Sequence, residues 1–125
     1  MKIDTDTNWY NKIGEENIRK LIHEFYLGVK DDQVLKPMYP DDLDGAELRL
    51  FYFMVQYLGG PTTYSEKRGH PRLRMRHVVF PVNKEAHDAW LGNMKNALDK
   101  IDIDKESYDF LWNYFVETAG FLRNR

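Results

Sequence analysis

The chain has 125 residues, of which 42% are hydrophobic and 14% aromatic, and its formal net charge at pH 7 is −2. This length predicts a single domain over residues 1–125, with enough apolar material for one core and aromatic side chains left to line a pocket. The weak charge gives no reason to expect nucleic acid or an anionic membrane as a partner. Because cysteine is absent, disulfides, thiolate-bound zinc, iron–sulfur clusters and covalent C-x-x-C-H cofactor attachment are excluded.

The N-terminal stretch MKIDTDTNWYNKIG contains no apolar run of signal-peptide length. Nothing elsewhere approaches the roughly 20 apolar residues of a membrane span. The sequence therefore predicts a cytoplasmic protein.

Apolar residues recur at the i, i+3/i+4 spacing of helices that are buried on one side. The segments with this pattern are Glu15–Lys30, Asp44–Leu58, Asn83–Ile101 and Asp104–Leu122. The stretch from Thr62 to Arg68 instead carries turn and polar residues with little apolar periodicity. The pattern predicts an all-α fold.

Helix breakers and caps agree with these limits. Gly59-Gly60-Pro61 ends the second segment, and Pro81 stands before the third. Asn83 and Asp104 are the residue types that cap helix N-termini, and we expect both to do so.

His77 ends a short arginine-rich segment, GHPRLRMRH, which begins at Gly69. Pro71 is tolerated in the first turn of a brief helix, and Pro81 prevents that helix from running far beyond His77. A neutral imidazole is a common ligand for iron, and arginines pair with carboxylates, so the segment suits a haem with an open axial position and two propionates. Two other interpretations stay open, namely a histidine that stabilises a helix C-terminus and a basic patch that binds nucleic acid.

Tyr26, Tyr39 and Trp90 each have two interpretations. Each could be an aromatic core residue, or a hydrogen-bond donor to a ligand bound on iron. Ala46 and Leu50 are apolar at positions where a distal histidine could have stood, so ligand stabilisation would depend on these three aromatics. The remaining histidines are interpreted as surface or capping residues: His23, His70 and His87.

Several short motifs occur together along the chain. They are Phe25-Tyr26, Tyr39-Pro40, Gln56-Tyr57 followed by Gly59-Gly60-Pro61, Tyr64-Ser65-Glu66, Gly69-His70-Pro71, Leu73-Arg74-Met75-Arg76-His77, Phe80 and Asp88-Ala89-Trp90-Leu91. The pattern G-H-P-x-L-R-x-R-H with a downstream A-W-L is highly specific. With it, the chain resembles a group II (O-type) truncated haemoglobin from roughly Trp9 to Leu122.

The resemblance implies a truncated globin, a two-over-two helical sandwich in which one antiparallel helix pair crosses another around non-covalent haem b. It implies His77 as the proximal metal ligand and Tyr26, Tyr39 and Trp90 as the distal residues. Ala46 and Leu50 match two distal positions of the second long helix. The side chains implied to contact haem are Arg49, Tyr64 and Arg76 near the propionates, together with Leu50, Phe53, Leu73, Met75, Phe80 and Trp90.

The expected function is the binding of dioxygen, and of other diatomic ligands such as NO and CO, with slow release. The resemblance leaves several physiological roles open: nitric oxide dioxygenation, reduction of peroxide or peroxynitrite, and oxygen sensing or delivery. Turnover would need a separate reductase, because the chain carries no flavin or nicotinamide motif. A monomer and a homodimer are both compatible with the sequence. The alternative is a non-haem helical interaction module that uses the basic segment Lys67–Arg76.

Overall fold

The computed structural model describes residues 8–68 and 82–123. Within these ranges the chain forms helices and no strand. The elements are α1 (Trp9–Ile13), α2 (Glu15–Asp31), the 3-10 helix η1 (Lys36–Met38), α3 (Leu43–Tyr57), α4 (Thr63–Arg68), α6 (Lys84–Leu98) and α7 (Lys105–Leu122).

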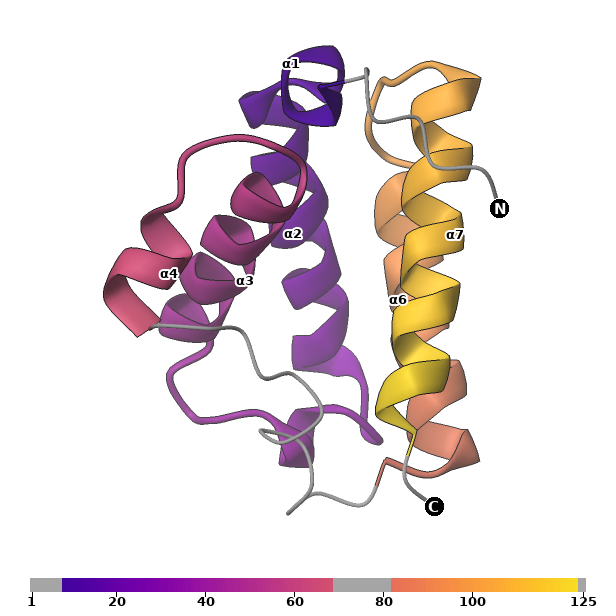
Figure 1. Ribbon diagram of the computed structural model, residues 1–125. Coiled ribbons are helices and arrows are strands. Elements are labelled where there is room, and N and C mark those ends of the chain that lie inside the picture. The colour runs from indigo at the N-terminus through magenta and orange to yellow at the C-terminus, as the bar shows by residue number, and fades with distance from the viewer. Residues whose placement is uncertain (1–7, 69–81, 124–125) are drawn as a thin grey trace.

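The long helices form two layers of two. Helix α2 packs on α3 within one layer and on α6 of the other layer, and α6 packs on α7 (Figure 1). The apolar face of α2 lies at the centre of this arrangement, where Ile18, Ile22, Phe25 and Val29 are fully buried. Burial of such a face stabilises a helix more than its intrinsic propensity does.

The predicted caps of the second layer are confirmed. Asn83 Oδ1 accepts a hydrogen bond of 2.9 Å from the amide of Ala86 at the start of α6. Asp104 Oδ1 accepts one of 2.9 Å from the amide of Ser107 at the start of α7. Helix α6 ends at Leu98, three residues before the predicted Ile101, and the short connection to α7 begins there.

The predicted end of the second long helix is also confirmed. Gly59 has φ +104°, a left-handed conformation that favours glycine. Its amide donates to the carbonyl of Gln56, and the amide of Gly60 donates to that of Val55 at 2.8 Å. This pattern satisfies the last carbonyls of α3 and turns the chain toward α4.

Residues 62–68, which show little apolar periodicity, nevertheless include the helix α4. Ser65 fixes this short helix to α3: its amide donates to Gln56 Oε1 at 2.9 Å, and Gln56 Nε2 donates to its hydroxyl at 2.7 Å. Tyr64 is buried, with 5% of its surface exposed. A single turn stabilised by contacts with another helix leaves no periodic signal in the sequence.

Helix α1 was not predicted either. Trp9 stacks on Phe110 of α7 with ring centroids 4.1 Å apart, and the amide of Tyr10 donates to the carbonyl of Leu58 at 2.9 Å. The short helix thus joins the ends of α3 and α7. Across the described parts of the chain, every helix is too short or too polar to span a bilayer.

Candidate functional site

A cavity of about 420 Å³ lies between the two helix layers. Its wall contains every predicted site residue that falls within the described ranges: Tyr26, Tyr39, Arg49, Leu50, Phe53, Tyr64 and Trp90. Most of the remaining wall is apolar. The structure therefore brings together residues from four separate elements and from the connection after η1.

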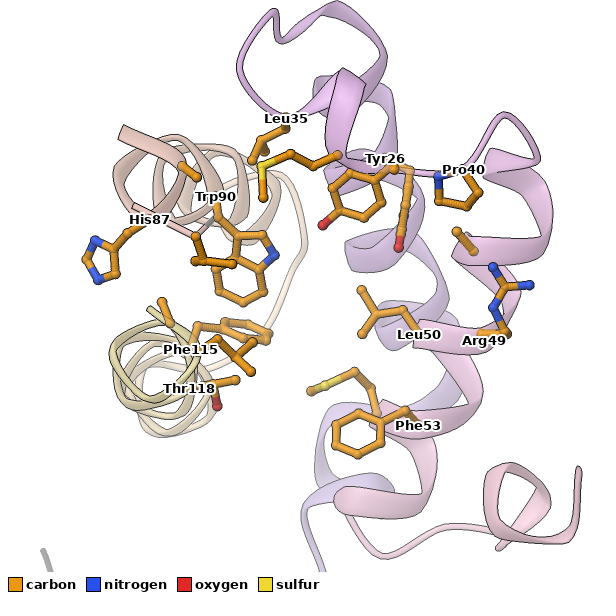
Figure 2. Close-up of a pocket in the computed structure, with 18 of the residues that line it drawn as sticks. Tyr26, Leu35, Pro40, Arg49, Leu50, Phe53, His87, Trp90, Phe115 and Thr118 are labelled. Atoms are coloured by element: carbon orange, nitrogen blue, oxygen red, sulfur yellow. The ribbon is translucent and has the colours of Figure 1, made fainter. Parts of the chain in front are cut away.

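Tyr26, Tyr39 and Trp90 form a polar group in this otherwise apolar wall. The rings of Tyr26 and Tyr39 meet edge to face, with centroids 5.6 Å apart at 83°. The Trp90 side chain hydrogen-bonds that of Tyr39, and since an indole nitrogen can only donate, the Tyr39 hydroxyl is the acceptor. Figure 2 shows Tyr26 and Trp90 on opposite sides of the cavity.

Tyr26 and Tyr39 keep their protons at any physiological pH. Burial raises the pKa of Tyr26 far above its usual range, assisted by Tyr39 and Glu47 and opposed by the positive charge of Arg49. Burial likewise raises the pKa of Tyr39, and the hydrogen bond from Trp90 only partly opposes it. The two hydroxyls are therefore available as hydrogen-bond donors.

The α3 side of the cavity is apolar at the positions where a distal histidine could have stood. Ala46 is buried with 7% exposed, and Leu50 lies one turn later on the same wall. Phe53 continues this face and meets Tyr64 of α4 edge to face, with centroids 5.4 Å apart. Arg49 supplies the positive charge of the α3 wall, and its guanidinium lies at the edge of the view in Figure 2.

An inter-helix clamp positions the connection that carries Tyr39. The Asp32 carboxylate accepts hydrogen bonds from the amides of Val34 at 2.9 Å and Leu35 at 3.0 Å, just after α2 ends. Its other oxygen accepts from Asn93 Nδ2 of α6 at 2.8 Å. Asn93 lies three residues after Trp90, so the clamp joins the helix that carries Trp90 to the connection that leads to Tyr39.

Gly28 makes this clamp possible. A Cβ atom on Gly28 would clash with the side-chain amide of Asn93, which approaches the α2 backbone there. Burial alone would raise the pKa of Asp32, but the hydrogen bonds from Leu35, Asn93 and Val34 outweigh that effect and lower it. The carboxylate is therefore held in its charged form.

The sequence interpretation missed several wall residues. Tyr114, Phe115 and Thr118 of α7 line the cavity, and the sequence predicted none of them as site residues. His87 was interpreted as a surface or capping residue, which was incomplete, because it is part-buried and also lines the cavity. Its spacing of three residues from Trp90 on one helix could have indicated this. Its Nδ1 lies 2.9 Å from Asp88 Oδ1.

The remaining predicted site residues lie outside the described residues. They are Leu73, Met75, Arg76, His77 and Phe80. Among residues 8–68 and 82–123, no group of three or more histidine, cysteine, aspartate or glutamate side chains could hold a metal ion.

Comparison with known proteins decides the family. A model described as "Bacterial-like globin" matches residues 8–124. The chain belongs to the bacterial-like globin family. The group 2 truncated hemoglobin YjbI of Bacillus subtilis is 41% identical over 116 residues, which cover 93% of this globin and 88% of that protein. Group 2 truncated hemoglobin 3-1 of Lotus japonicus is 40% identical, over 94% of this globin and 72% of that protein.

Solved structures agree with this globin over almost its full length. The hemoglobin of Chloroflexus aurantiacus superimposes with a TM-score of 0.92 at 40% identity, covering 96% of this chain and 100% of the other. A "truncated oxygen-avid haemoglobin" from Bacillus subtilis gives 0.89 at 41%, covering 94% and 100%. The predicted truncated-globin fold and the resemblance to group II truncated haemoglobins are thereby confirmed. Membership implies haem as the cofactor and haem-based binding of diatomic gases such as oxygen.

Proposed function

We propose that this globin holds haem b non-covalently in the cavity between its two helix layers, with His77 as the proximal ligand. The cavity volume of about 420 Å³ falls within the range of small-molecule sites, and its wall combines apolar surface with a few convergent polar groups, as such sites do. Arg49 is a suitable partner for a propionate. Arg76 and Tyr64 are the other proposed propionate contacts. When bound, the group would supply an iron with one position open to a diatomic gas.

The observation that carries the proposal is the convergence of Tyr26, Tyr39 and Trp90 on one cavity, from α2, the connection after η1 and α6. Each offers a proton on an otherwise apolar wall, and the raised pKa values of the phenols keep two of those protons in place. A diatomic ligand that carries partial negative charge would accept hydrogen bonds from these groups. Each bond would contribute about 1 kcal/mol, and more with charge, so two or three would slow ligand escape about a hundredfold or more.

Slow release makes a poor oxygen carrier and a better participant in redox chemistry. The relative from Bacillus subtilis named oxygen-avid supports high oxygen affinity for this chain. Nitric oxide dioxygenation and peroxide reduction both fit, and both need electrons from a separate reductase. The single domain over residues 1–125, the cytoplasmic location and the choice between monomer and homodimer remain predictions from the sequence.

The test is the absorption spectrum of the purified protein with and without added haemin. We expect a Soret band, a five-coordinate or weakly six-coordinate ferrous form, and slow oxygen release. His77→Ala should abolish or severely weaken haem ligation. His23→Ala is the matched control, because the His23 side chain is 53% exposed and paired with Glu47 on the outside of α2 and α3.

Two results would contradict the proposal. A His77→Ala protein with an unchanged histidine-ligated spectrum would mean that another residue holds the iron. A colourless wild-type protein that takes up no haemin would favour the interaction module based on Lys67–Arg76.

A further inference from the structure

Asn93 lies where α6 packs on α2, and its side-chain amide is fixed in one orientation. Its Nδ2 donates to Asp32 Oδ2 at 2.8 Å and to the carbonyl of Ala89, one turn earlier on α6, at 2.9 Å. Both amide protons are therefore engaged. Its Oδ1 faces the backbone of α2 at Gly28, where a Cβ atom would clash with it.

A short series of hydrogen-bonded turns leads from Asp32 to Tyr39. The Asp32 carbonyl accepts from the amide of Lys36 at 2.9 Å, and the Leu35 carbonyl accepts from that of Met38 at 2.8 Å. The amide of Tyr39 then donates to the carbonyl of Lys36 at 3.3 Å. The Leu35 side chain is buried in the cavity wall, which fixes the middle of the series. A displacement of Asp32 is therefore carried along the chain to Tyr39.

The Asp32–Asn93 clamp and the hydrogen bond from Trp90 to Tyr39 connect the same two segments. Trp90 stands three residues before Asn93 on α6, and Tyr39 stands at the end of the turns that begin at Asp32. The clamp lies outside the cavity wall, whereas Trp90 and Tyr39 belong to it. A hydrogen bond weakens steeply when its length and angle leave the favoured range, so a small shift of the connection relative to α6 would break the bond in the wall.

We propose that Asn93 is a positioning residue for ligand binding: by holding Asp32 it keeps the Tyr39 hydroxyl within reach of the Trp90 N–H and so slows ligand release. This rests on the proposed haem function. Because the Tyr39 oxygen accepts from Trp90, its own proton is directed away from the indole and toward the cavity. Without Asn93 the connection stays attached to the end of α2 through the amides that donate to Asp32, but it loses this attachment to α6.

The first measurement is stopped-flow oxygen dissociation from the ferrous, haem-loaded protein. Asn93→Ala removes the bond to Asp32, and Asn96→Ala is the matched control, because Asn96 lies on the same helix and is exposed. The loss of one oriented neutral hydrogen bond should speed release about fivefold in Asn93→Ala, whereas Asn96→Ala should match the wild type. In a protein that already carries Tyr39→Phe, Asn93→Ala should change release by less than about twofold, because the hydroxyl that it positions is absent.

A double variant separates positioning from stability. Gly28→Ala added to Asn93→Ala fills the space that the amide leaves, and it should raise the free energy of unfolding in urea without restoring a bond to Asp32. A positioning role predicts that the double variant still releases oxygen about fivefold faster than the wild type. A role in stability alone predicts that the release rate returns to the wild-type value together with the stability.

The second measurement is the nuclear magnetic resonance spectrum of the indole N–H groups in the isotope-labelled carbon monoxide complex. The chain has three tryptophans, so Trp9 and Trp112 serve as internal references for Trp90. The Trp90 signal is identified by its absence from Trp90→Phe. In Asn93→Ala we expect the Trp90 indole proton to move to a lower chemical shift, because it loses its hydrogen bond, while the other two signals stay in place.

The outcomes distinguish this positioning role from the proposed function. Oxygen release from Asn93→Ala within about twofold of the wild type, or an unmoved Trp90 signal, would overturn the role of Asn93 and leave the proposed function intact. Wild-type release from the double variant with Gly28→Ala would do the same. A wild-type protein that takes up no haemin would overturn the positioning role together with the proposed function.

Discussion

Replacing Trp90 by phenylalanine removes one donor from the cavity while preserving an aromatic ring at that position. The ring of Trp90 packs against Phe25 at 5.6 Å and Phe115 at 5.8 Å, and phenylalanine can keep much of both contacts. What is lost is the indole N–H, which hydrogen-bonds the Tyr39 hydroxyl. The substitution therefore tests the hydrogen bond more than the packing.

The expected magnitude follows from the type of bond. A neutral hydrogen bond contributes about 1 kcal/mol, and one to a group with charge about 1.5 to 3 kcal/mol. Since about 1.4 kcal/mol corresponds to a factor of ten, the loss should speed oxygen release by about five- to a hundredfold. The larger value applies when Trp90 donates to the ligand itself, and the smaller one when it acts by orienting the Tyr39 hydroxyl.

The assay is stopped-flow measurement of oxygen dissociation from the ferrous protein. Trp112→Phe is the control, because Trp112 contacts Lys95 near the surface and does not line the cavity. A double-mutant cycle with Tyr39→Phe separates the two cases, since residues that share a hydrogen bond give non-additive effects. An off-rate equal to that of the wild type would mean that the Trp90 N–H contributes nothing to holding the ligand.

Three further predictions concern stability and can be measured by urea unfolding. Asn93→Ala should lower the free energy of unfolding by about 1 to 3 kcal/mol, because the Asp32 carboxylate loses a partner, whereas the exposed Asn96→Ala should change little. Gly28→Ala should destabilise the wild-type protein despite the better helix propensity of alanine. In the protein that already carries Asn93→Ala the same change should stabilise, since the clashing amide is gone. Destabilisation in both backgrounds would refute this account. The pKa of Asp32 is lowered in the folded protein, so the stability that its charged form contributes is present above about pH 4 and is lost as the pH falls through the lowered value. The free energies of unfolding of Asn93→Ala and wild type should therefore converge in acid.

Helical periodicity fixed the long helices because each buries one continuous face. The predicted limits of α2 and α3 agree with the structure to one residue. Asn83 and Asp104 cap the N-termini of their helices as predicted, and Gly59 follows the end of α3. These features are local, so a single sequence reveals them. The short helices α1 and α4 depend on contacts such as Trp9 with Phe110 and Gln56 with Ser65. No local sequence pattern predicts that these residues pair.

The sequence by itself determined the kinds of chemistry available: no thiolate, a few aromatic donors, and an arginine-flanked histidine within a specific motif. The tertiary structure decided which donors meet. Tyr26, Tyr39 and Trp90 are separated along the chain. They share a cavity only because α2 packs on α6 and the Asp32–Asn93 clamp holds the connection that follows α2 and carries Tyr39. It also decided that Tyr57 faces solvent, because α7 covers only one side of its ring. Burial and stacking arise between helices, and the order of residues within one helix does not specify them.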